Sequence, residues 1–173
     1  MNVLFDLDLT LINSMAAEPL RRQRRWKQVY TLIPSLLPYP GINELLTELH
    51  ELDTMLCIVT SAPRPYCQRV IHQWGWPIAA TVCYHDTQAH KPNPAPFQKG
   101  LSRLEASSSH AISVGDSASD IIASKRADIC SVAALWGAIN HTELLLAKPA
   151  FVCESVADLR KLLLSQISSL GGG

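Results

Sequence analysis

Two aspartates, Asp6 and Asp8, follow a short apolar run at residues 3–5. On an extended segment, side chains two residues apart point to the same side. Adjacent carboxylates repel each other, so one of them tends to stay protonated unless a cation lies between them. Such a pair can divide its work between a nucleophile and a general acid. Aspartates that cap a helix or close a turn would show the same spacing, so the pair alone leaves both interpretations open.

Phosphate-binding groups are expected at two later positions. Thr60 and Ser61 follow the apolar run 55–59, where a hydroxyl and backbone N–H groups can hold phosphate oxygens. Ser and Thr also cap many helices, so this signal is weak alone. Lys91 stands in segment 90–94, whose two prolines restrict the backbone. A lysine held this way suits a phosphoryl group, although a solvated surface lysine would look the same.

A fourth polar segment begins at Gly115 and contains Asp116 and Asp120. The glycine allows a tight turn after the apolar run 111–114. Acids four residues apart across a helix start project from one face. Asp116 is well placed to bind magnesium, which usually takes one or two protein carboxylates besides phosphate. Helix capping by Ser and Asp is the alternative explanation.

Short apolar runs and longer amphipathic segments alternate along the chain, which predicts strands and helices in turn. We expect strands at residues 3–5, 55–59, 79–83, 111–114, 129–132 and 151–152. We expect helices at residues 43–52, 66–74, 94–104, 117–127 and 140–147. This order predicts an α/β fold, a doubly wound, Rossmann-like and mostly parallel sheet with helices on both faces. Ligands of such sheets bind beyond the carboxyl ends of the strands, where all four polar features fall.

Length and composition suit a single domain. The chain has 173 residues, of which 47% are hydrophobic, and we expect one domain over residues 1–165 and a flexible tail over residues 166–173. Its net charge is zero, so no overall field favours nucleic acid or a membrane. No apolar stretch is long enough to span a membrane, and no signal-peptide pattern is present. We therefore expect a cytoplasmic protein with five reduced cysteines.

The four features together resemble the haloacid dehalogenase superfamily of phosphohydrolases. The resemblance covers about residues 2–160 and rests on four motifs in chain order. These are Asp6-Leu7-Asp8-Leu9-Thr10, Thr60-Ser61, Lys91-Pro92-Asn93-Pro94, and Gly115-Asp116 with Asp120. The segment around Thr60 with Arg64, and later Trp136-Gly137, look most like the phosphoglycolate-phosphatase branch.

The resemblance implies a role for each of these residues. Asp6 would attack phosphorus, and Asp8 would protonate the leaving oxygen and later activate water. Thr60 would hydrogen-bond the phosphoryl group and Lys91 would neutralise its charge, with Ser61 and Arg64 as further substrate-binding candidates. Magnesium would be bound by Asp6, the backbone carbonyl of Asp8, and Asp116. Asp120 would orient Lys91 or support the metal site from behind. The presence of Asp8 argues against dehalogenation, which has no leaving oxygen to protonate.

A short helical insertion at about residues 14–38 stands where the phosphoglycolate-phosphatase branch carries a full cap. A full cap closes over the substrate and excludes water. We expect one helix here, with the basic run 21–27, followed by a proline-rich return. Either a large substrate or a second copy of the chain would then cover the open site. The basic run would contact a polyanion or would simply be a solvated helix face.

The sequence therefore predicts a magnesium-dependent phosphatase that hydrolyses a phosphomonoester through an aspartyl-phosphate intermediate. Two alternatives remain open. One is a phosphatase for a macromolecule, such as a nucleic-acid end or a phosphoprotein. The other is a phosphate-binding regulatory protein with low turnover.

Overall fold

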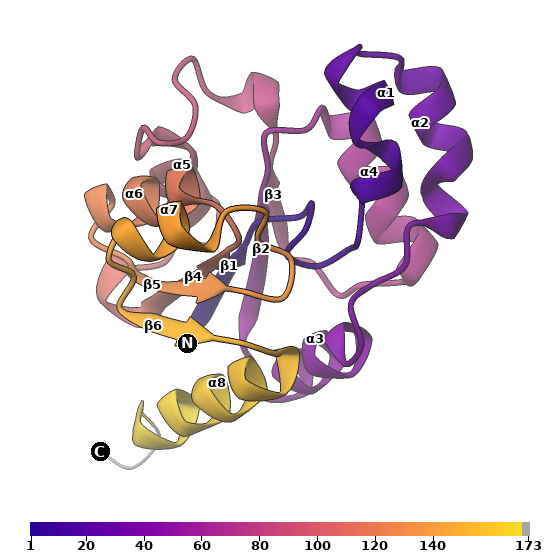
Figure 1. The fold of residues 1–173 in the computed structure, drawn as a ribbon. Coiled ribbons are helices and arrows are strands. Elements are labelled where there is room, and N and C mark those ends of the chain that lie inside the picture. The colour runs from indigo at the N-terminus through magenta and orange to yellow at the C-terminus, as the bar shows by residue number, and fades with distance from the viewer. Residues whose placement is uncertain (171–173) are drawn as a thin grey trace.

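Six parallel strands form one sheet in the order β3-β2-β1-β4-β5-β6 in the computed structural model, which describes residues 1–170 (Figure 1). The strands are β1 (Asn2–Phe5), β2 (Met55–Val59), β3 (Ala80–Val82), β4 (Ala111–Gly115), β5 (Cys130–Ala134) and β6 (Phe151–Cys153). Every neighbouring pair is parallel, so the expected mostly parallel sheet is parallel throughout. The α/β prediction is confirmed.

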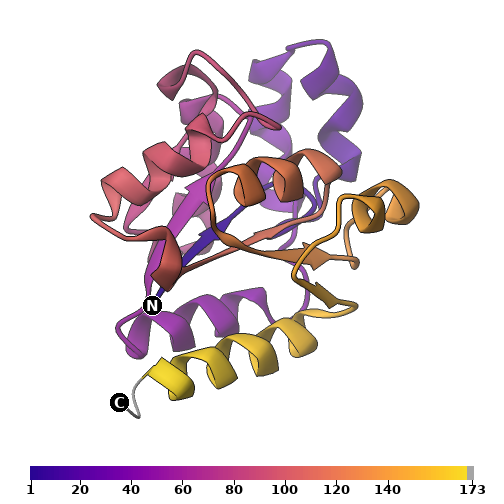
Figure 2. The same cartoon turned by 90° about the vertical axis from the view of Figure 1, so that its left-hand side faces the viewer.

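Helices cover both faces of this sheet (Figure 2). They are α1 (Glu18–Arg22), α2 (Trp26–Leu32), α3 (Ile42–Glu51), α4 (Arg64–Trp74), α5 (Ala95–Arg103), α6 (Ala118–Arg126), α7 (His141–Leu146) and α8 (Val156–Leu170). Short 3-10 turns stand at Met15–Ala17, Ile33–Ser35, Tyr84–Asp86 and Ser108–His110. The figures show α3 and α8 side by side on one face, with α5, α6 and α7 on the other.

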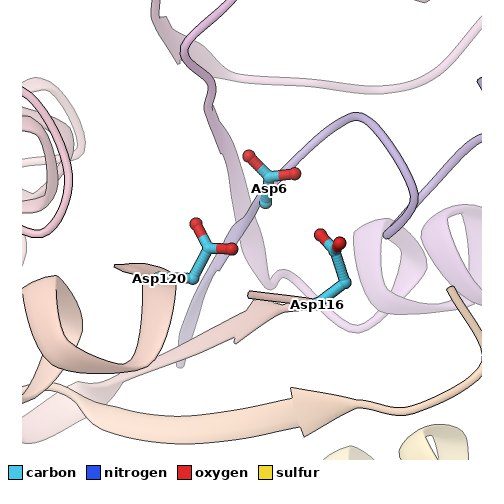
Figure 3. Close-up of side chains that lie close together, drawn as sticks. All are labelled: Asp6, Asp116 and Asp120. Carbon is cyan, nitrogen blue, oxygen red and sulfur yellow. The ribbon is translucent and has the colours of Figure 1, made fainter. Parts of the chain in front are cut away.

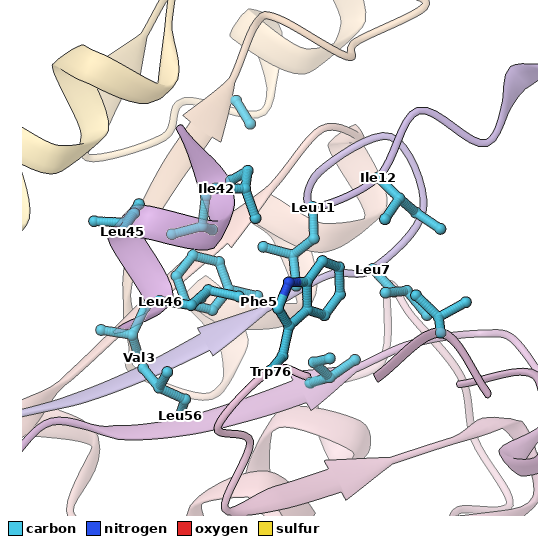
Figure 4. Packing of buried hydrophobic residues seen from close by; sticks show 14 of the residues in the cluster. Val3, Phe5, Leu7, Leu11, Ile12, Ile42, Leu45, Leu46, Leu56 and Trp76 are labelled. Carbon is cyan, nitrogen blue, oxygen red and sulfur yellow. The ribbon is translucent and has the colours of Figure 1, made fainter. Parts of the chain in front are cut away.

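Alternating side chains of β1 divide the core between the two faces. Val3 and Phe5 belong to a large cluster that includes residues of α3, α4 and α8 (Figure 4). Leu4 points the other way, into a second cluster with residues of α5 and α6. This is how a strand that is buried on both sides must pack, because successive side chains point to opposite faces. The catalytic candidates follow directly after this doubly buried strand.

The insertion at residues 14–38 contains two short helices, α1 and α2, where we expected one. The helical conformation is interrupted between them because Arg24 adopts a positive φ of 54°. An L-residue in that region ends an α-helix. Val29 of α2 and Ile33 are buried in the main core cluster. The insertion therefore packs on the sheet domain, beside α4 (Figure 1).

The carboxyl-terminal helix α8 was not among the predicted helices. We expected a flexible tail from residue 166, but α8 begins at Val156 and continues to Leu170. Leu159 and Leu163 are fully buried, and Ile167 packs against the same cluster at the next four-residue step. This apolar stripe is the physical reason for the helix. The part of the expected tail at 171–173 lies outside the described residues.

Within residues 1–170, the structure contains no helix whose length and apolar character would let it cross a lipid bilayer.

Candidate active site

A tight turn after β1 carries the first two aspartates. The N–H of Asp6 donates to the carbonyl of Val114 at 2.9 Å, which fixes the end of β1 beside β4. The N–H of Leu11 then donates back to the carbonyl of Leu7 at 2.9 Å. Leu9 sits inside this turn with a φ of +65°. That conformation favours glycine, so Leu9 adds local strain to the turn.

Lys91 is the central cation of the site. Its Nζ donates to Asp6 Oδ1 and to Asp120 Oδ1, each at 2.6 Å, and to the carbonyl of Val59 at 2.9 Å. Only 5% of its side chain is exposed. Three partners therefore use all three ammonium donors. This geometry holds Lys91 beside Asp6, and it excludes a solvated surface lysine.

Asp120 serves both of the roles that its sequence position suggested. One carboxylate oxygen binds Lys91 at 2.6 Å. The other accepts the backbone N–H of Ser117 at 3.1 Å, which completes a capping box at the start of α6. The helix cap thus fixes the orientation of the group that holds Lys91.

Three carboxylates meet next to Lys91 (Figure 3). Oxygen atoms of Asp6, Asp116 and Asp120 all lie within 4.8 Å of one another. Hard oxygen ligands of this kind suit magnesium. Because Asp120 is already bound to Lys91 and Ser117, Asp6 and Asp116 are the carboxylates that remain to hold a cation.

The pKa values of Asp6 and Asp116 are raised in this buried site, where Lys91 balances only part of the negative charge. Burial raises the pKa of Asp6 to about 7, with Asp120 and Asp8 adding to the shift and Lys91 opposing it. Burial, together with the charges of Asp6 and Asp120, raises the pKa of Asp116 to about 8. Burial alone would lower the pKa of Lys91, but the carboxylates of Asp120 and Asp6 raise it above its ordinary value. A divalent cation would relieve this repulsion.

The site residues surround one open hollow of about 200 Å³, here called the aspartate hollow. Thr60 is buried at its wall, and its Oγ accepts the backbone N–H of Ala62 at 3.1 Å. The predicted residues that line this hollow are Asp6, Asp8, Thr60, Ser61, Lys91, Asp116 and Asp120. The structure therefore brings together seven of the eight residues singled out from the sequence.

Arg64 is the eighth, and it lies outside the aspartate hollow. Its guanidinium binds Asp86 at 2.5 Å and Thr81 Oγ1 at 2.9 Å. Asp86 is also bound by Arg103 and by the backbone N–H of Cys83. The contacts of Arg64 fasten α4 to the segment after β3, so we do not carry it forward as a substrate-binding residue.

Asp8 has two partners that the sequence did not reveal. The hydroxyl of Tyr66 donates to Asp8 Oδ1 at 2.7 Å, and Nη2 of Arg21 donates to Asp8 Oδ2 at 2.7 Å. Tyr66 comes from α4 and Arg21 from α1, at sequence separations of 58 and 13 residues. No local pattern connects residues so far apart. The basic run thus directs at least Arg21 into the site.

The motif residues Thr10, Trp136 and Gly137 support the turn from behind. Thr10 Oγ1 donates to Asp116 Oδ1 at 3.0 Å, and the indole of Trp136 donates to the Thr10 carbonyl at 3.0 Å. A Cβ on Gly137 would lie 1.7 Å from the carbonyl oxygen of Leu9. The loop after β5 can therefore approach the turn only with glycine at this position.

Comparison with known proteins finds relatives of this chain. The family described as haloacid dehalogenase-like hydrolase matches residues 20–134, more than half of the chain. A phosphoglycolate phosphatase of Vibrio parahaemolyticus is 32% identical over 126 residues, which cover 70% of this chain and 54% of the relative. The pyrophosphatase PpaX of Halalkalibacterium halodurans is 29% identical over 124 residues, which cover 70% and 58%. The chain spans about half the length of the curated relatives it matches.

Solved structures show the same fold. A hydrolase from Pseudomonas syringae has a TM-score of 0.79 at 22% identity, covering 95% of this chain and 98% of that one. CbbY from Rhodobacter sphaeroides, in complex with phosphate, has a TM-score of 0.78 at 17% identity, covering 91% and 95%. Identities this low support the fold alone. With the family match and the motif order, they lead to one conclusion: the chain belongs to the haloacid dehalogenase-like hydrolase family.

Proposed function

We propose that the protein is a magnesium-dependent phosphatase that hydrolyses a phosphomonoester through an aspartyl-phosphate intermediate. The observation that carries this proposal is the environment of Asp6. Its carboxylate lies in an open hollow, 2.6 Å from Lys91 and within 4.8 Å of Asp116. Phosphoryl transfer depends mainly on positioning and on neutralising charge, and this hollow offers both.

In the proposed first step, an oxygen of Asp6 forms a bond to phosphorus while the bond from phosphorus to the leaving oxygen breaks. Asp8 gives its proton to that oxygen. In the second step, Asp8 takes a proton from water, whose oxygen attacks phosphorus and releases Asp6. Throughout, the Thr60 hydroxyl donates to a phosphoryl oxygen, and the positive charge of Lys91 neutralises part of the phosphoryl charge.

Magnesium, held by the carboxylates of Asp6 and Asp116, would supply further positive charge opposite the phosphoryl oxygens. The donor set fits this ion, because both carboxyl groups are hard oxygen ligands with raised pKa values. The backbone carbonyl of Asp8 remains the predicted third protein ligand.

Substitution of the nucleophile gives the direct test. We expect Asp6→Asn to lower kcat for 4-nitrophenyl phosphate by more than about 10⁴-fold, because an amide cannot form the intermediate. Chelation of magnesium should abolish turnover of the unmodified protein. Asp53→Asn is the matched control, because Asp53 is an exposed residue with a φ of +54°, a conformation that asparagine adopts readily. Substantial activity in Asp6→Asn would exclude Asp6 as the nucleophile.

The names of the relatives favour a small phosphorylated substrate, and we propose that class for this chain. The cytoplasmic location and a second copy covering the site stay predictions. Macromolecular substrates and a low-turnover regulatory role also stay predictions, and no contact described above favours either of them.

A further inference from the structure

A second hollow adjoins the aspartate hollow. It has a volume of about 370 Å³ and is here called the arginine hollow, after Arg21, Arg22 and Arg24 in its wall. Glu18, Arg21 and Ser61 line both hollows, so the two are adjacent and share part of their wall. A group attached to a phosphate beside Asp6 therefore lies next to the arginine hollow.

The arginine hollow is positively charged. Its wall contains three arginines and one acidic residue, Glu18. Glu18 binds Arg22 at 2.8 Å and Arg21 at 3.3 Å. Within residues 1–170, Arg24 forms no ion pair and donates no side-chain hydrogen bond. The insertion thus contributes a net positive charge beside a site that already holds several carboxylates, which attracts an anion to this side.

Aromatic side chains, among them Trp26 and Tyr84, also line the arginine hollow. Trp26 packs against Tyr66 with ring centroids 5.9 Å apart. Tyr84 stacks on His90 at 4.1 Å, which holds its partly exposed ring in place. Rings fixed in this way present apolar surface to a ligand at little cost in conformational entropy.

Arg21 couples the two hollows through Asp8. Both carboxylate oxygens of Asp8 are occupied, one by Tyr66 and the other by Arg21. To protonate a leaving oxygen, Asp8 must turn one of its oxygens toward that oxygen. Exchange of the ion pair with Arg21, at 2.7 Å, would free Asp8 Oδ2 for this proton transfer. An anion bound beside Arg21 competes directly for the guanidinium.

We propose that the arginine hollow binds the leaving group of the substrate, and that this leaving group combines an apolar or aromatic body with a second negative charge. Arg22 and Arg24 bind the charge, and Arg21 is a positioning residue that releases Asp8 when the anion arrives. This inference rests on the proposed phosphatase function and specifies its substrate class.

Two matched esters test the proposal with the full chain and magnesium. Phenyl phosphate has a neutral leaving group, and 4-carboxyphenyl phosphate has the same body with a second charge. The measured quantity is the ratio of kcat/KM for the carboxylated ester to that for phenyl phosphate. Intrinsic reactivity cancels when this ratio is compared between variants. We expect Arg22→Gln and Arg24→Gln each to lower the ratio about threefold to fivefold, the size of a partly exposed ion pair.

Arg25→Gln is the control, because Arg25 is an exposed neighbour in the chain that does not line the arginine hollow. It should leave the ratio unchanged. Arg24→Glu should lower the ratio further and favour 4-(aminomethyl)phenyl phosphate, whose leaving group is cationic. In Arg21→Gln, the kcat values of the two esters should converge while KM for the carboxylated ester rises. A purely structural role for Arg21 would lower both kcat values together.

The outcomes separate the two proposals. Hydrolysis of both esters with a ratio that Arg22→Gln and Arg24→Gln leave unchanged would overturn the leaving-group site and retain the phosphatase. Hydrolysis of neither ester, nor of 4-nitrophenyl phosphate, would contradict the phosphatase function and this inference with it.

Discussion

At the scale of single residues, the carboxylates of the site repel one another, and a cation between them would weaken this repulsion. Asp6, Asp116 and Asp120 share one small volume, and Lys91 neutralises only part of their charge. Burial then raises the pKa of Asp6 to about 7 and that of Asp116 to about 8. In the metal-free protein, both groups hold protons at a pH where exposed aspartates are ionised.

These two raised pKa values make the stability of the metal-free protein depend on pH. Without metal, the unfolded chain releases these protons from about pH 4 upward, and the folded protein releases them only near pH 7 to 8. The two groups therefore favour the folded state less as the pH rises across that interval. A magnesium ion held by Asp6 and Asp116 would take the place of the protons, so proton release would accompany its binding.

We predict that the apparent magnesium affinity rises as the pH increases from 6 to 8. Titration calorimetry in two buffers of different ionisation enthalpy should detect proton release at pH 6.5 and little above pH 9. Asp6→Asn, which removes one of the titrating groups, should release fewer protons. An affinity that stays constant between pH 6 and pH 8 would contradict the assignment of these carboxyl groups as ligands.

At the scale of elements, the junction between β4 and α6 determines where two of these carboxylates lie. Gly115 ends β4, and a Cβ there would lie 2.4 Å from the Cβ of Asp120. The strand and the first turn of α6 can approach this closely only because position 115 has no side chain. The close approach holds Asp120 against Lys91.

We predict that Gly115→Ala lowers the free energy of unfolding by about 1–3 kcal/mol, the usual effect of overpacking. It should also lower kcat/KM by at least about tenfold, because displacing Asp120 displaces Lys91. Urea unfolding and steady-state kinetics measure the two effects.

Gly100→Ala in α5 is the matched control. Its Cβ would lie 2.7 Å from a terminal methyl group of Leu4, in the core on the far side of β1 from α3. That variant should lose stability and keep its kcat/KM. If Gly115→Ala lost only stability, the junction would have no role in positioning the site.

At the scale of the whole molecule, the helices that cover the core are separate from the carboxyl edge of the sheet, where the hollows lie. The helices α3 and α8 close one face of the core, away from the insertion that flanks the hollows (Figure 1). Glu48 of α3 and Arg160 of α8 also form an ion pair, but it is exposed and contributes little. The apolar stripe of α8 is what covers the sheet.

We predict that Leu163→Ala, which truncates a fully buried side chain of α8, lowers the free energy of unfolding by about 2–4 kcal/mol. It should leave kcat and KM unchanged, because α8 does not line either hollow. Urea unfolding measures the first effect. Lys161→Ala, at an exposed position of the same helix, should change stability by less than about 0.5 kcal/mol. A large loss of activity in folded Leu163→Ala would show that α8 affects the site.

The sequence by itself determined the six strands, the five helices α3 to α7, and most of the polar residues around Asp6, while α8 and the second helix of the insertion were not predicted. Each strand was visible as a local apolar run, and the carboxyl ends of parallel strands converge in any doubly wound sheet. This rule was enough to place Thr60, Lys91 and Asp116 near Asp6. For Asp120, the sequence was equally compatible with a helix cap and with a site residue. The structure shows that its carboxylate serves both roles.

Only the tertiary structure decided the surroundings of Asp8 and the lining of the two hollows. Arg21 and Tyr66 reach Asp8 from two different helices, while Arg64 turns away to Asp86. The break at Arg24 divides the insertion into two helices and places three arginines around one hollow. These contacts join segments whose spacing follows no strand or helix period. They depend on how the insertion packs against α4, and no local pattern in the sequence specifies that packing.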